Sequence, residues 1–333
     1  MKAAVHTRYG PPDVVRIADV EKPTVADHDV LVKVQATTVN RTDCGFRAAK
    51  PFIVRFFAGL MRPGETVLGS EFAGVVEAVG GSVTAFKPGD RVFGFSEGRF
   101  GAHAEYLVMP DDGALATMPT NTTFEQAAPS TEGSHYALSY IRAAKIRSGQ
   151  HVLVNGATGA IGSAAVQLIT SLGASVTAVC GAPHVELVKG LGADRVIDST
   201  AEDFTKDEQT YDVVFDAVGK SSFGRCTRLL KRRGIYLSSD LGPLSQNPLL
   251  ALLTPLLGGK KVMFPLPPKH DQAGVRYFKD LIEAGNFTPV IDRRYPLDQI
   301  VEAYRYVETG QKIGNVVITV DPSVEQRTPS SPA

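Results

Sequence analysis

One glycine-rich turn restricts the fold of this chain more than any other segment. Residues 156–162 (GATGAIG) follow the apolar residues 152–155 and precede residues with helical composition. Such a turn lets backbone N–H groups at the positive end of a helix bind a pyrophosphate. Gly159 and Gly162 fill two of the usual three glycine positions, and Ala157 stands at the first. We predict a dinucleotide site here that includes Thr158, Gly159, Ala160, Ile161 and Gly162, the alternative being a glycine-rich helix start in an unrelated α/β fold.

Predicted helices and strands alternate around this turn. Helical spacing is found at 125–146 and 183–193, and strand composition at 175–181, 195–198, 211–219 and 235–240. This alternation predicts a doubly wound parallel sheet in an α/β fold. Residues 260–266 are expected to form its last strand, after a buried helix and turn at 248–259.

The first third of the chain has a different character. Short β-rich runs end at glycine or proline turns, at 29–39, 71–80, 86–95 and 102–110. Many short strands with such turns predict a small barrel. Residues 277–320 mix helices with two strands and are expected to return to that barrel. We therefore expect a barrel domain at 1–123 and 267–322, a dinucleotide domain at 124–266 and a disordered tail at 323–333.

Composition excludes several classes of protein. Lys and Arg together number 35, as do Asp and Glu, so no broad nucleic-acid surface is expected. The apolar stretch 248–259 is too short and too interrupted to span a membrane, and residues 1–10 lack the apolar run of a signal peptide. The three cysteines have neither disulfide nor zinc-knuckle spacing. We expect a cytoplasmic protein.

The residues at the end of the second predicted strand of the parallel sheet indicate whether the chain binds NADPH or NADH. NAD sites usually carry an acid there, but this strand ends at Cys180 and Gly181, with His184 and Lys189 close behind. A missing carboxylate removes repulsion against a 2′-phosphate, so NADPH is favoured over NADH. His184 would otherwise be a solvated residue at a helix start. Further residues should line the same crevice at the carboxyl ends of later strands: Ala217, Val218, Gly219 and Ser238.

Seven motifs carry a family resemblance over residues 1–320. They are VNRTD (39–43), GSEFAGVVEAVG (69–80), KPGDRVFGF (87–95), VLVNGATGAIG (152–162), LGADRVID (191–198), FDAVG (215–219) and GNVVITV (314–320). The chain resembles the medium-chain dehydrogenase/reductase superfamily, and within it the zinc-free quinone oxidoreductase branch. The resemblance implies a GroES-like β-barrel domain and a Rossmann domain. The predicted cofactor contacts further include Ser199 and Asn315.

The resemblance also bears on metal binding. Zinc-dependent members carry a Gly-His-Glu turn whose histidine binds the metal, whereas this chain has Gly69-Ser70-Glu71. Asn40 stands in place of a cysteine ligand, and the third ligand position falls near Thr131. Hydroxyl and amide groups are poor zinc ligands, so no metal is expected. Glu71 could be an isolated metal ligand, but the sequence favours a structural role in which its carboxylate caps a helix or stabilises a turn.

Without zinc, the resemblance implies hydride transfer from the nicotinamide to a quinone or an α,β-unsaturated carbonyl compound. Asn40, Asp43 and Ser70 should lie near the nicotinamide, with Asn40 donating an N–H to the substrate carbonyl. His135 stands where relatives have a threonine against the ring. Each of these residues would otherwise have a structural role, such as a cap for Asp43. Residues 42–47 contain no tyrosine, so solvent would supply the proton.

Two other functions are compatible with the same sequence: an enoyl-thioester reductase of a biosynthetic pathway, and a non-catalytic nucleotide-binding regulatory protein. A homodimer is also expected, because an exposed edge strand at 260–266 needs to be paired or covered. The alternative is that this strand packs only against its own domain.

Overall fold

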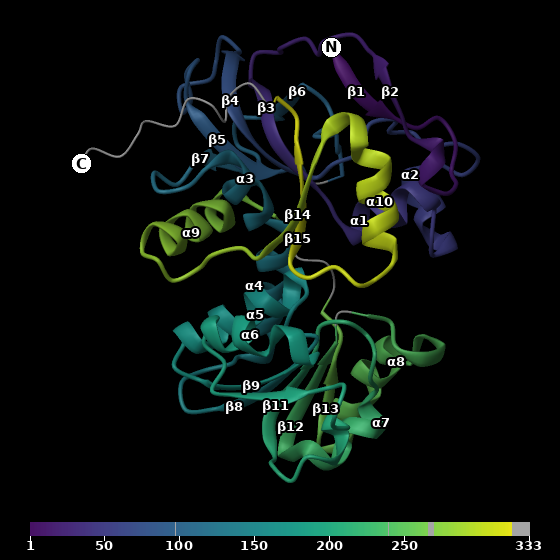
Figure 1. Ribbon diagram of the computed structural model, residues 1–333, viewed down its shortest axis with the longest axis vertical. Helices are drawn as coiled ribbons and strands as arrows, with labels where there is room; N and C mark the ends of the chain where they lie inside the picture. The colour runs from purple at the N-terminus through teal and green to yellow at the C-terminus, as the bar shows by residue number, and fades with distance from the viewer. Residues whose placement is uncertain (97, 239, 266–269, 322–333) are drawn as a thin grey trace. The chain divides into compact units, whose positions relative to one another are not determined.

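The computed structural model describes residues 1–96, 98–238, 240–265 and 270–321 (Figure 1). The predicted tail at 323–333, and the end of the strand predicted at 260–266, lie outside the described residues. The chain divides into two compact units. Unit 1 contains Met1–Glu132, His270–Ala284 and the residues from Ile291 onward, and unit 2 contains Gly133–Lys269 and Gly285–Val290.

Unit 1 is the strand-rich domain that the sequence predicts. Its main sheet has seven strands, in the order β14-β15-β3-β4-β5-β7, with β6 also paired to β3, while β1 and β2 pair separately. The bounds of these strands are β1 Lys2–Val5, β2 Arg16–Asp19, β3 Asp29–Val39, β4 Glu71–Val79, β5 Arg91–Phe95, β6 Tyr106–Pro110, β7 Leu115–Thr117, β14 Ile291–Pro296 and β15 Asn315–Thr319. Alternate residues of β3 and β4 bury Val30, Val32, Val34, Phe72 and Val76 in one cluster.

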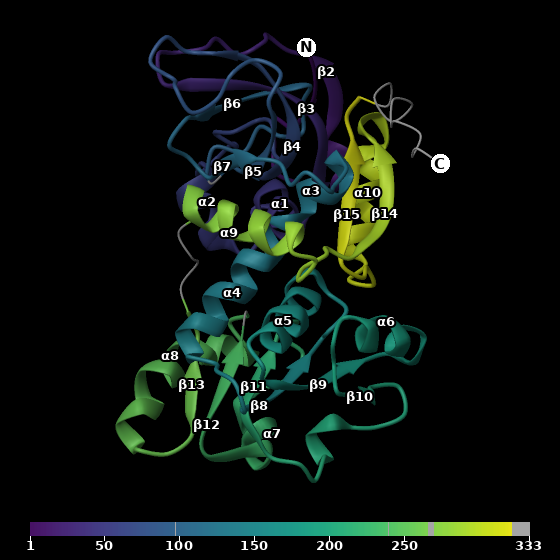
Figure 2. The same cartoon turned by 90° about the vertical axis from the view of Figure 1, so that its left-hand side faces the viewer.

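Five helices flank these strands: α1 (Arg41–Ala48), α2 (Arg55–Ala58), α3 (Phe124–Ala127), α9 (Gln272–Glu283) and α10 (Ile300–Glu308). Figure 2 shows α10 beside β14 and β15, against which it packs. Its buried residues Ile300, Ala303, Tyr304 and Val307 recur at the spacing of one helical face.

Unit 2 is the predicted doubly wound parallel sheet. Its strands are β8 (His151–Asn155), β9 (Ser175–Cys180), β10 (Arg195–Asp198), β11 (Tyr211–Asp216), β12 (Leu230–Ser238) and β13 (Lys261–Met263). They lie in the order β10-β9-β8-β11-β12-β13, and all neighbours are parallel. This is the Rossmann order, which reverses between β8 and β11. The helices are α4 (Glu132–Ala144), α5 (Ala160–Ser171), α6 (Val185–Gly190), α7 (Phe223–Cys226) and α8 (Gln246–Leu253).

Several predicted boundaries were wrong. The helix predicted at 125–146 is broken by a 3-10 turn at Ala128–Ser130, because Pro129 has no N–H to donate. Strand β12 starts at Leu230, five residues before the predicted strand, since Leu230 already pairs with Tyr211. The helix predicted at 183–193 is shorter, because a 3-10 turn at Ala182–His184 precedes α6.

The apolar stretch 248–259 forms the predicted helix and turn, but it is not buried. Leu252 is 71%, Leu256 81% and Leu257 80% exposed. Only Asn247 and Thr254 are buried in α8 and the 3-10 helix that follows it. The apolar composition of this segment therefore reflects a surface rather than a core. Among the described helices, none is long and apolar enough to cross a membrane.

Candidate active site

The site in unit 1 begins at the N-terminus of α1. Asn40 has an extended backbone, and its Oδ1 accepts a hydrogen bond of 2.9 Å from the N–H of Asp43. The Asp43 carboxylate accepts in return from the N–H of Asn40, at 3.0 Å. This reciprocal capping box fixes both side chains at the end of β3. It also shows that Asp43 has the cap role that the sequence left as its alternative.

The Gly69-Ser70-Glu71 turn joins this cap to the start of β4. Gly69 has φ +92°, and a Cβ there would lie 2.4 Å from the His103 ring, so only glycine fits. Its N–H donates to Asp43 Oδ1 at 3.1 Å. Asn40 Nδ2 donates to Ser70 Oγ at 3.0 Å. The structure thus brings together Asn40, Asp43 and Ser70, three of the four predicted catalytic residues, and all three are buried.

Glu71 is the anchor of a second network. Its Oε2 accepts from Thr38 Oγ1 at 2.7 Å. Its Oε1 accepts from Thr131 N, Thr131 Oγ1 and Glu132 N at 3.1, 3.0 and 2.6 Å. The carboxylate therefore caps the first residues of α4, in agreement with the cap interpretation.

Glu132 is a buried acid that the sequence analysis missed. Its Oε1 accepts a 2.5 Å hydrogen bond from Thr42 Oγ1, and its backbone N–H is the one bound by Glu71. No motif marks Glu132, since its burial depends on the meeting of α1, β4 and α4. An Asp43–Glu71–Glu132 trio of buried acids results, and we call it the acid cluster.

Burial controls the protonation of the acid cluster. Desolvation raises the pKa of Asp43 to about 7, although the N–H groups of Asn40 and Gly69 oppose the shift. Desolvation raises the pKa of Glu132 well above its usual range, and the neighbouring Glu71 charge adds to the shift. Burial also raises the pKa of Glu71, but its hydrogen-bond donors oppose this effect. We therefore assign the negative charge of this pair to Glu71 and the proton to Glu132.

Two bases flank the acid cluster. Desolvation lowers the pKa of His103 to about 4, so the imidazole is neutral although Nε2 lies 3.9 Å from Asp43 Oδ2. Its Nε2 donates to the Thr38 carbonyl at 2.7 Å. Desolvation also lowers the pKa of Lys312, an effect opposed by the neighbouring acid cluster, in which Glu71 carries the charge. Lys312 Nζ donates to the Gly314 carbonyl at 2.5 Å.

The raised pKa of Asp43 predicts how stability depends on pH. The unfolded carboxyl titrates near 3.8 and the folded one near 7, so unfolding releases a proton between these values. Stability conferred by the protonated form is therefore lost as pH rises from about 4 to about 7. Asp43→Asn should be less stable than wild type at pH 5, with a deficit that shrinks by a few kcal/mol toward pH 8. Denaturant titrations at each pH measure this deficit.

Asp112→Asn offers a matched control, because it replaces an exposed acid that lies outside the acid cluster. If Asp43→Asn is less stable than wild type by the same free energy at pH 5 and at pH 8, the raised pKa of Asp43 is contradicted.

The three positions at which the family resemblance places zinc ligands carry Asn40, Ser70 and Thr131. Asn40 and Ser70 bind each other, and Thr131 binds Glu71. Amide and hydroxyl groups do not match the thiolate and imidazole preference of zinc. In the described ranges, no group of three or more His, Cys, Asp or Glu side chains is arranged to hold a metal ion. The donor set therefore does not fit zinc.

The glycine turn in unit 2 fits a pyrophosphate. Gly159 is the N-cap of α5, and no side chain caps the first turn of the helix. The N–H groups of Ala160, Ile161 and Gly162 therefore have no partner within the helix. A Cβ on residue 162 would lie 2.1 Å from the Gly156 carbonyl oxygen, which explains why position 162 requires glycine. A Cβ on Gly159 would meet only that same oxygen at 3.6 Å, so the space in front of the helix is open.

Other predicted cofactor residues lie at the carboxyl ends of neighbouring strands. Val218 packs on the turn, since a Cβ on Gly156 would lie 2.3 Å from its Cγ1. Ala217 N donates to the Asn155 carbonyl at 3.0 Å, and Gly219 has φ +64°. Ser238 is buried at the end of β12. Thr158 and these residues border the point where the strand order reverses.

A carboxylate that the sequence analysis overlooked lies beside the tip of β9, at the end of β10. Cys180 pairs with Asp198 at the end of β10, and Ser199 N donates to the Cys180 carbonyl at 2.8 Å. Hydrogen bonds from Thr200 lower the pKa of Asp198, so a negative charge lies beside Gly181. His184 is half-buried, and Lys189 is paired with Glu186.

Two predicted site residues belong to a different unit from the groups with which they were predicted to act. His135 is half-buried in the first turn of α4 in unit 2. Asn315 is the buried first residue of β15 and belongs to unit 1, whereas the glycine turn belongs to unit 2.

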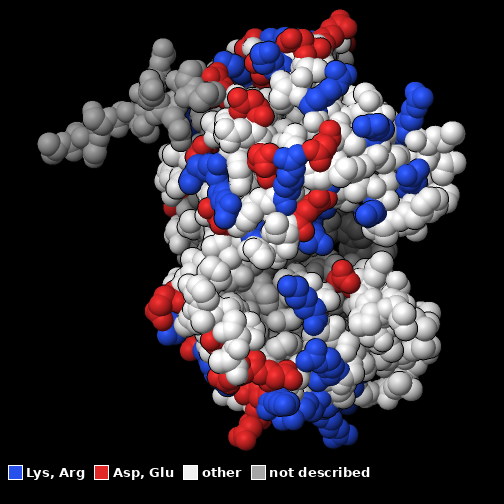
Figure 3. Space-filling model, turned by 45° about the vertical axis from the view of Figure 1, so that its right-hand side comes forward, with Lys and Arg blue, Asp and Glu red and all other residues white. Residues whose placement is uncertain are grey.

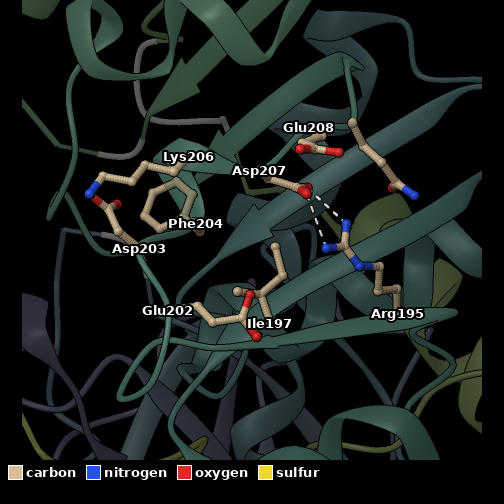
Figure 4. A pocket seen from close by; sticks show the side chains of 9 residues that line it. Arg195, Ile197, Glu202, Asp203, Phe204, Lys206, Asp207 and Glu208 are labelled. Atoms are coloured by element: carbon tan, nitrogen blue, oxygen red, sulfur yellow. Dashed lines mark hydrogen bonds and ion pairs between the residues drawn. The ribbon is translucent and has the colours of Figure 1, made fainter.

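A groove of about 670 Å³ outside β10 is unsuited to an anionic cofactor. Figure 4 shows the acids Glu202, Asp203, Asp207 and Glu208 around it. Arg195 is held by Asp207 through two hydrogen bonds of 2.8 and 3.0 Å. The acids outnumber the bases, so repulsion would oppose a pyrophosphate.

Comparison with known proteins agrees with this geometry. Residues 26–120 match the alcohol dehydrogenase GroES-like domain, and residues 191–318 match a domain described as zinc-binding dehydrogenase. The 2-methylene-furan-3-one reductase of Solanum lycopersicum is 32% identical and covers 96% of this chain and 79% of its own. The chloroplastic NADPH-dependent alkenal/one oxidoreductase of Arabidopsis thaliana is 31% identical over the same shares. The structure of the quinone oxidoreductase from Coxiella burnetii superposes with a TM-score of 0.86, at 26% identity, and covers 96% and 99% of the two chains.

Proposed function

Since the chain belongs to the medium-chain dehydrogenase/reductase superfamily, and within it is quinone oxidoreductase-like, we propose that it is an NADPH-dependent reductase of quinones or α,β-unsaturated carbonyl compounds that works without zinc. One observation carries the proposal. The positions that would hold a metal are instead occupied by Asn40, Ser70 and Thr131, which are hydrogen-bonded to neighbouring side chains. The matched domain is described as zinc-binding, but these side chains are poor ligands for that ion.

The chemistry that a reduced nicotinamide cofactor supplies is hydride transfer. The N–H groups of Ala160, Ile161 and Gly162 would bind its pyrophosphate at the start of α5. The side-chain amide of Asn40 has two N–H donors, and one of them donates to Ser70 Oγ. In our proposal the second N–H binds the substrate carbonyl and stabilises the enolate that forms. Asp43 orients Asn40 through the capping box, and solvent supplies the proton.

We favour NADPH because strand β9 ends at Cys180 and Gly181 without an acid of its own. The carboxylate of Asp198 is engaged by Thr200 N and Oγ1, at 2.9 and 2.7 Å, rather than presented alone. A relative whose name states NADPH dependence supports the same choice. We place the enzyme in a reducing compartment such as the cytoplasm, because its three cysteines are buried free thiols.

Steady-state oxidation of NADPH, followed with a panel of acceptors, tests the proposed activity. A quinone and an alkenal should be reduced, with NADPH preferred to NADH, whereas a saturated aldehyde should not. An enoyl thioester in the same panel distinguishes the biosynthetic alternative. Tight NADPH binding without turnover of any acceptor would instead indicate a regulatory nucleotide-binding protein.

Metal analysis provides an independent prediction. Purified protein should contain well under one zinc per chain, and incubation with a chelator should leave the rate of NADPH oxidation unchanged. One zinc per chain, together with loss of activity on chelation, would overturn the zinc-free assignment.

We further propose a homodimer formed through the surface next to β13. Figure 3 shows an area without charged side chains over α8. Leu249, Leu252, Leu256 and Leu257 are each at least 59% exposed there. The outward edge of β13 is partly occupied, because Val262 N donates to Thr254 Oγ1 at 2.9 Å. The leucines, more than the strand edge, are therefore the expected contact.

Light scattering should give a mass of two chains for wild type. Replacing Leu252 and Leu256 by glutamate should give a single-chain mass, because two charges would be buried in the contact. As a control on another exposed apolar side chain, Met61→Glu in unit 1 should leave the dimer intact. A single-chain mass for wild type at micromolar concentration would refute the dimer.

A further inference from the structure

A small cavity in unit 1 has the composition of a ligand site. It measures about 120 Å³ and lies between the N-terminal residues, α1 and residues 57–68. Its lining combines the apolar side chains of Phe46, Phe57, Leu68 and Phe100 with polar groups, which include His6 and Glu65. Phe46 and Phe100 meet edge to face, with ring centroids 4.7 Å apart. These walls suit a flat apolar ligand.

One buried polar group interrupts the apolar lining. His6 lines the cavity and is only 2% exposed. Its Nδ1 lies 3.1 Å from the Thr66 carbonyl oxygen, which can only accept, so Nδ1 carries the hydrogen. Nε2 is then an acceptor, and among the described residues it has no hydrogen-bond partner. Desolvation lowers the pKa of His6, which favours the neutral ring and so leaves Nε2 able to accept a hydrogen bond.

A buried hydrogen-bond acceptor without a partner is stabilised when a bound molecule donates a hydrogen bond to it. Among the described lining residues, His6 is the only one whose side chain is both polar and buried, and the exposed Glu65 also borders the cavity. An apolar protein cavity of about 150 Å³ holds benzene, so a ring of that size is of the right order here.

We propose that this cavity binds a small uncharged aromatic alcohol of the phenol type. The ligand O–H donates to His6 Nε2, and the ring packs against Phe46 and Phe100. Phe57, which is 81% exposed, forms the outer wall. The proposal does not depend on the reductase activity.

Wild-type protein tests the hydrogen bond directly. Phenol and anisole are similar in shape, but only phenol donates. In titrations followed by ring ¹⁵N NMR, phenol should shift His6 Nε2 and bind roughly tenfold more tightly than anisole. The exposed ring of His28 should not respond. Equal affinities for the two compounds, or no His6 response up to millimolar phenol, would overturn the proposal, and the second result would mean that the group binds water alone.

Two substitutions locate the binding. Phe57→Ala should weaken both ligands severalfold, because it removes the outer wall. The neighbouring Phe56 is 69% exposed and does not line the cavity, so Phe56→Ala should leave both affinities unchanged. His6→Leu should abolish the preference for phenol over anisole. Equal effects of Phe57→Ala and Phe56→Ala would place any binding elsewhere.

Discussion

Replacing Gly159 by valine should raise the dissociation constant for NADPH on the order of 100-fold or more, because the branched side chain would stand where the pyrophosphate meets the start of α5. The fold should survive. Gly159 has φ −69°, which any residue adopts, and the nearest atom to an added Cβ is 3.6 Å away. Isothermal titration calorimetry measures the affinity, and circular dichroism checks the fold.

Gly224 offers a matched control in the same unit. It lies exposed in α7, and an added Cβ would meet nothing within 4 Å. Gly224→Val should bind NADPH like wild type. If Gly159→Val also binds normally while folded, the pyrophosphate does not lie at this turn.

Removing the Glu71 carboxylate should destabilise unit 1 more than any other single change considered above. Glu71→Ala would leave the donors of Thr38, Thr131 and Glu132 without their acceptor in a buried site. A buried donor without a partner costs about 1–3 kcal/mol, so a loss of about 3–5 kcal/mol is expected. The midpoint temperature of thermal unfolding should fall by on the order of 10 °C. Hydrogen exchange of β4 peptides localises the effect.

Two further variants separate hydrogen bonding from charge. Glu71→Gln keeps an oxygen for the three donors to Oε1, so it should lose less than half as much stability as Glu71→Ala. Glu77, on the same strand, forms an exposed ion pair with Lys22, and Glu77→Ala should cost about 1 kcal/mol or less. Equal losses for Glu71→Ala and Glu77→Ala would contradict the anchoring role of Glu71.

Sequence alone predicted the parts of the fold that depend on local patterns. The turn at 156–162 combines a strand, glycines and a helix within a short segment, and the structure has α5 and β8 where expected. Strand β3 matches its predicted range of 29–39. The wrong boundaries occur where a tertiary contact overrides local preference, as in the pairing of Leu230 with Tyr211.

The candidate site was predictable in its capping motif and not in its acid cluster. Asn40 and Asp43 are three residues apart, so one helix start brings them together. Glu132 meets Thr42 and Glu71 across 90 and 61 residues of chain, and no local pattern encodes that meeting. Asp198 likewise reaches the tip of β9 through strand pairing. Such contacts depend on how the strands and helices are arranged in the fold. Sequence periodicity predicts the strands and helices, but not which distant residues meet.

The hydrogen bond from Asn40 to Ser70 and the one from Thr131 to Glu71 also bear on evolutionary history. A histidine at position 70 would lose the hydroxyl that accepts from Asn40, and a cysteine at position 131 would lose the hydroxyl that donates to Glu71. Each single step toward a metal-binding site therefore breaks a buried bond before any ion can compensate. A chain with these two hydrogen bonds would therefore gain a histidine at position 70 or a cysteine at position 131 only at a cost in stability.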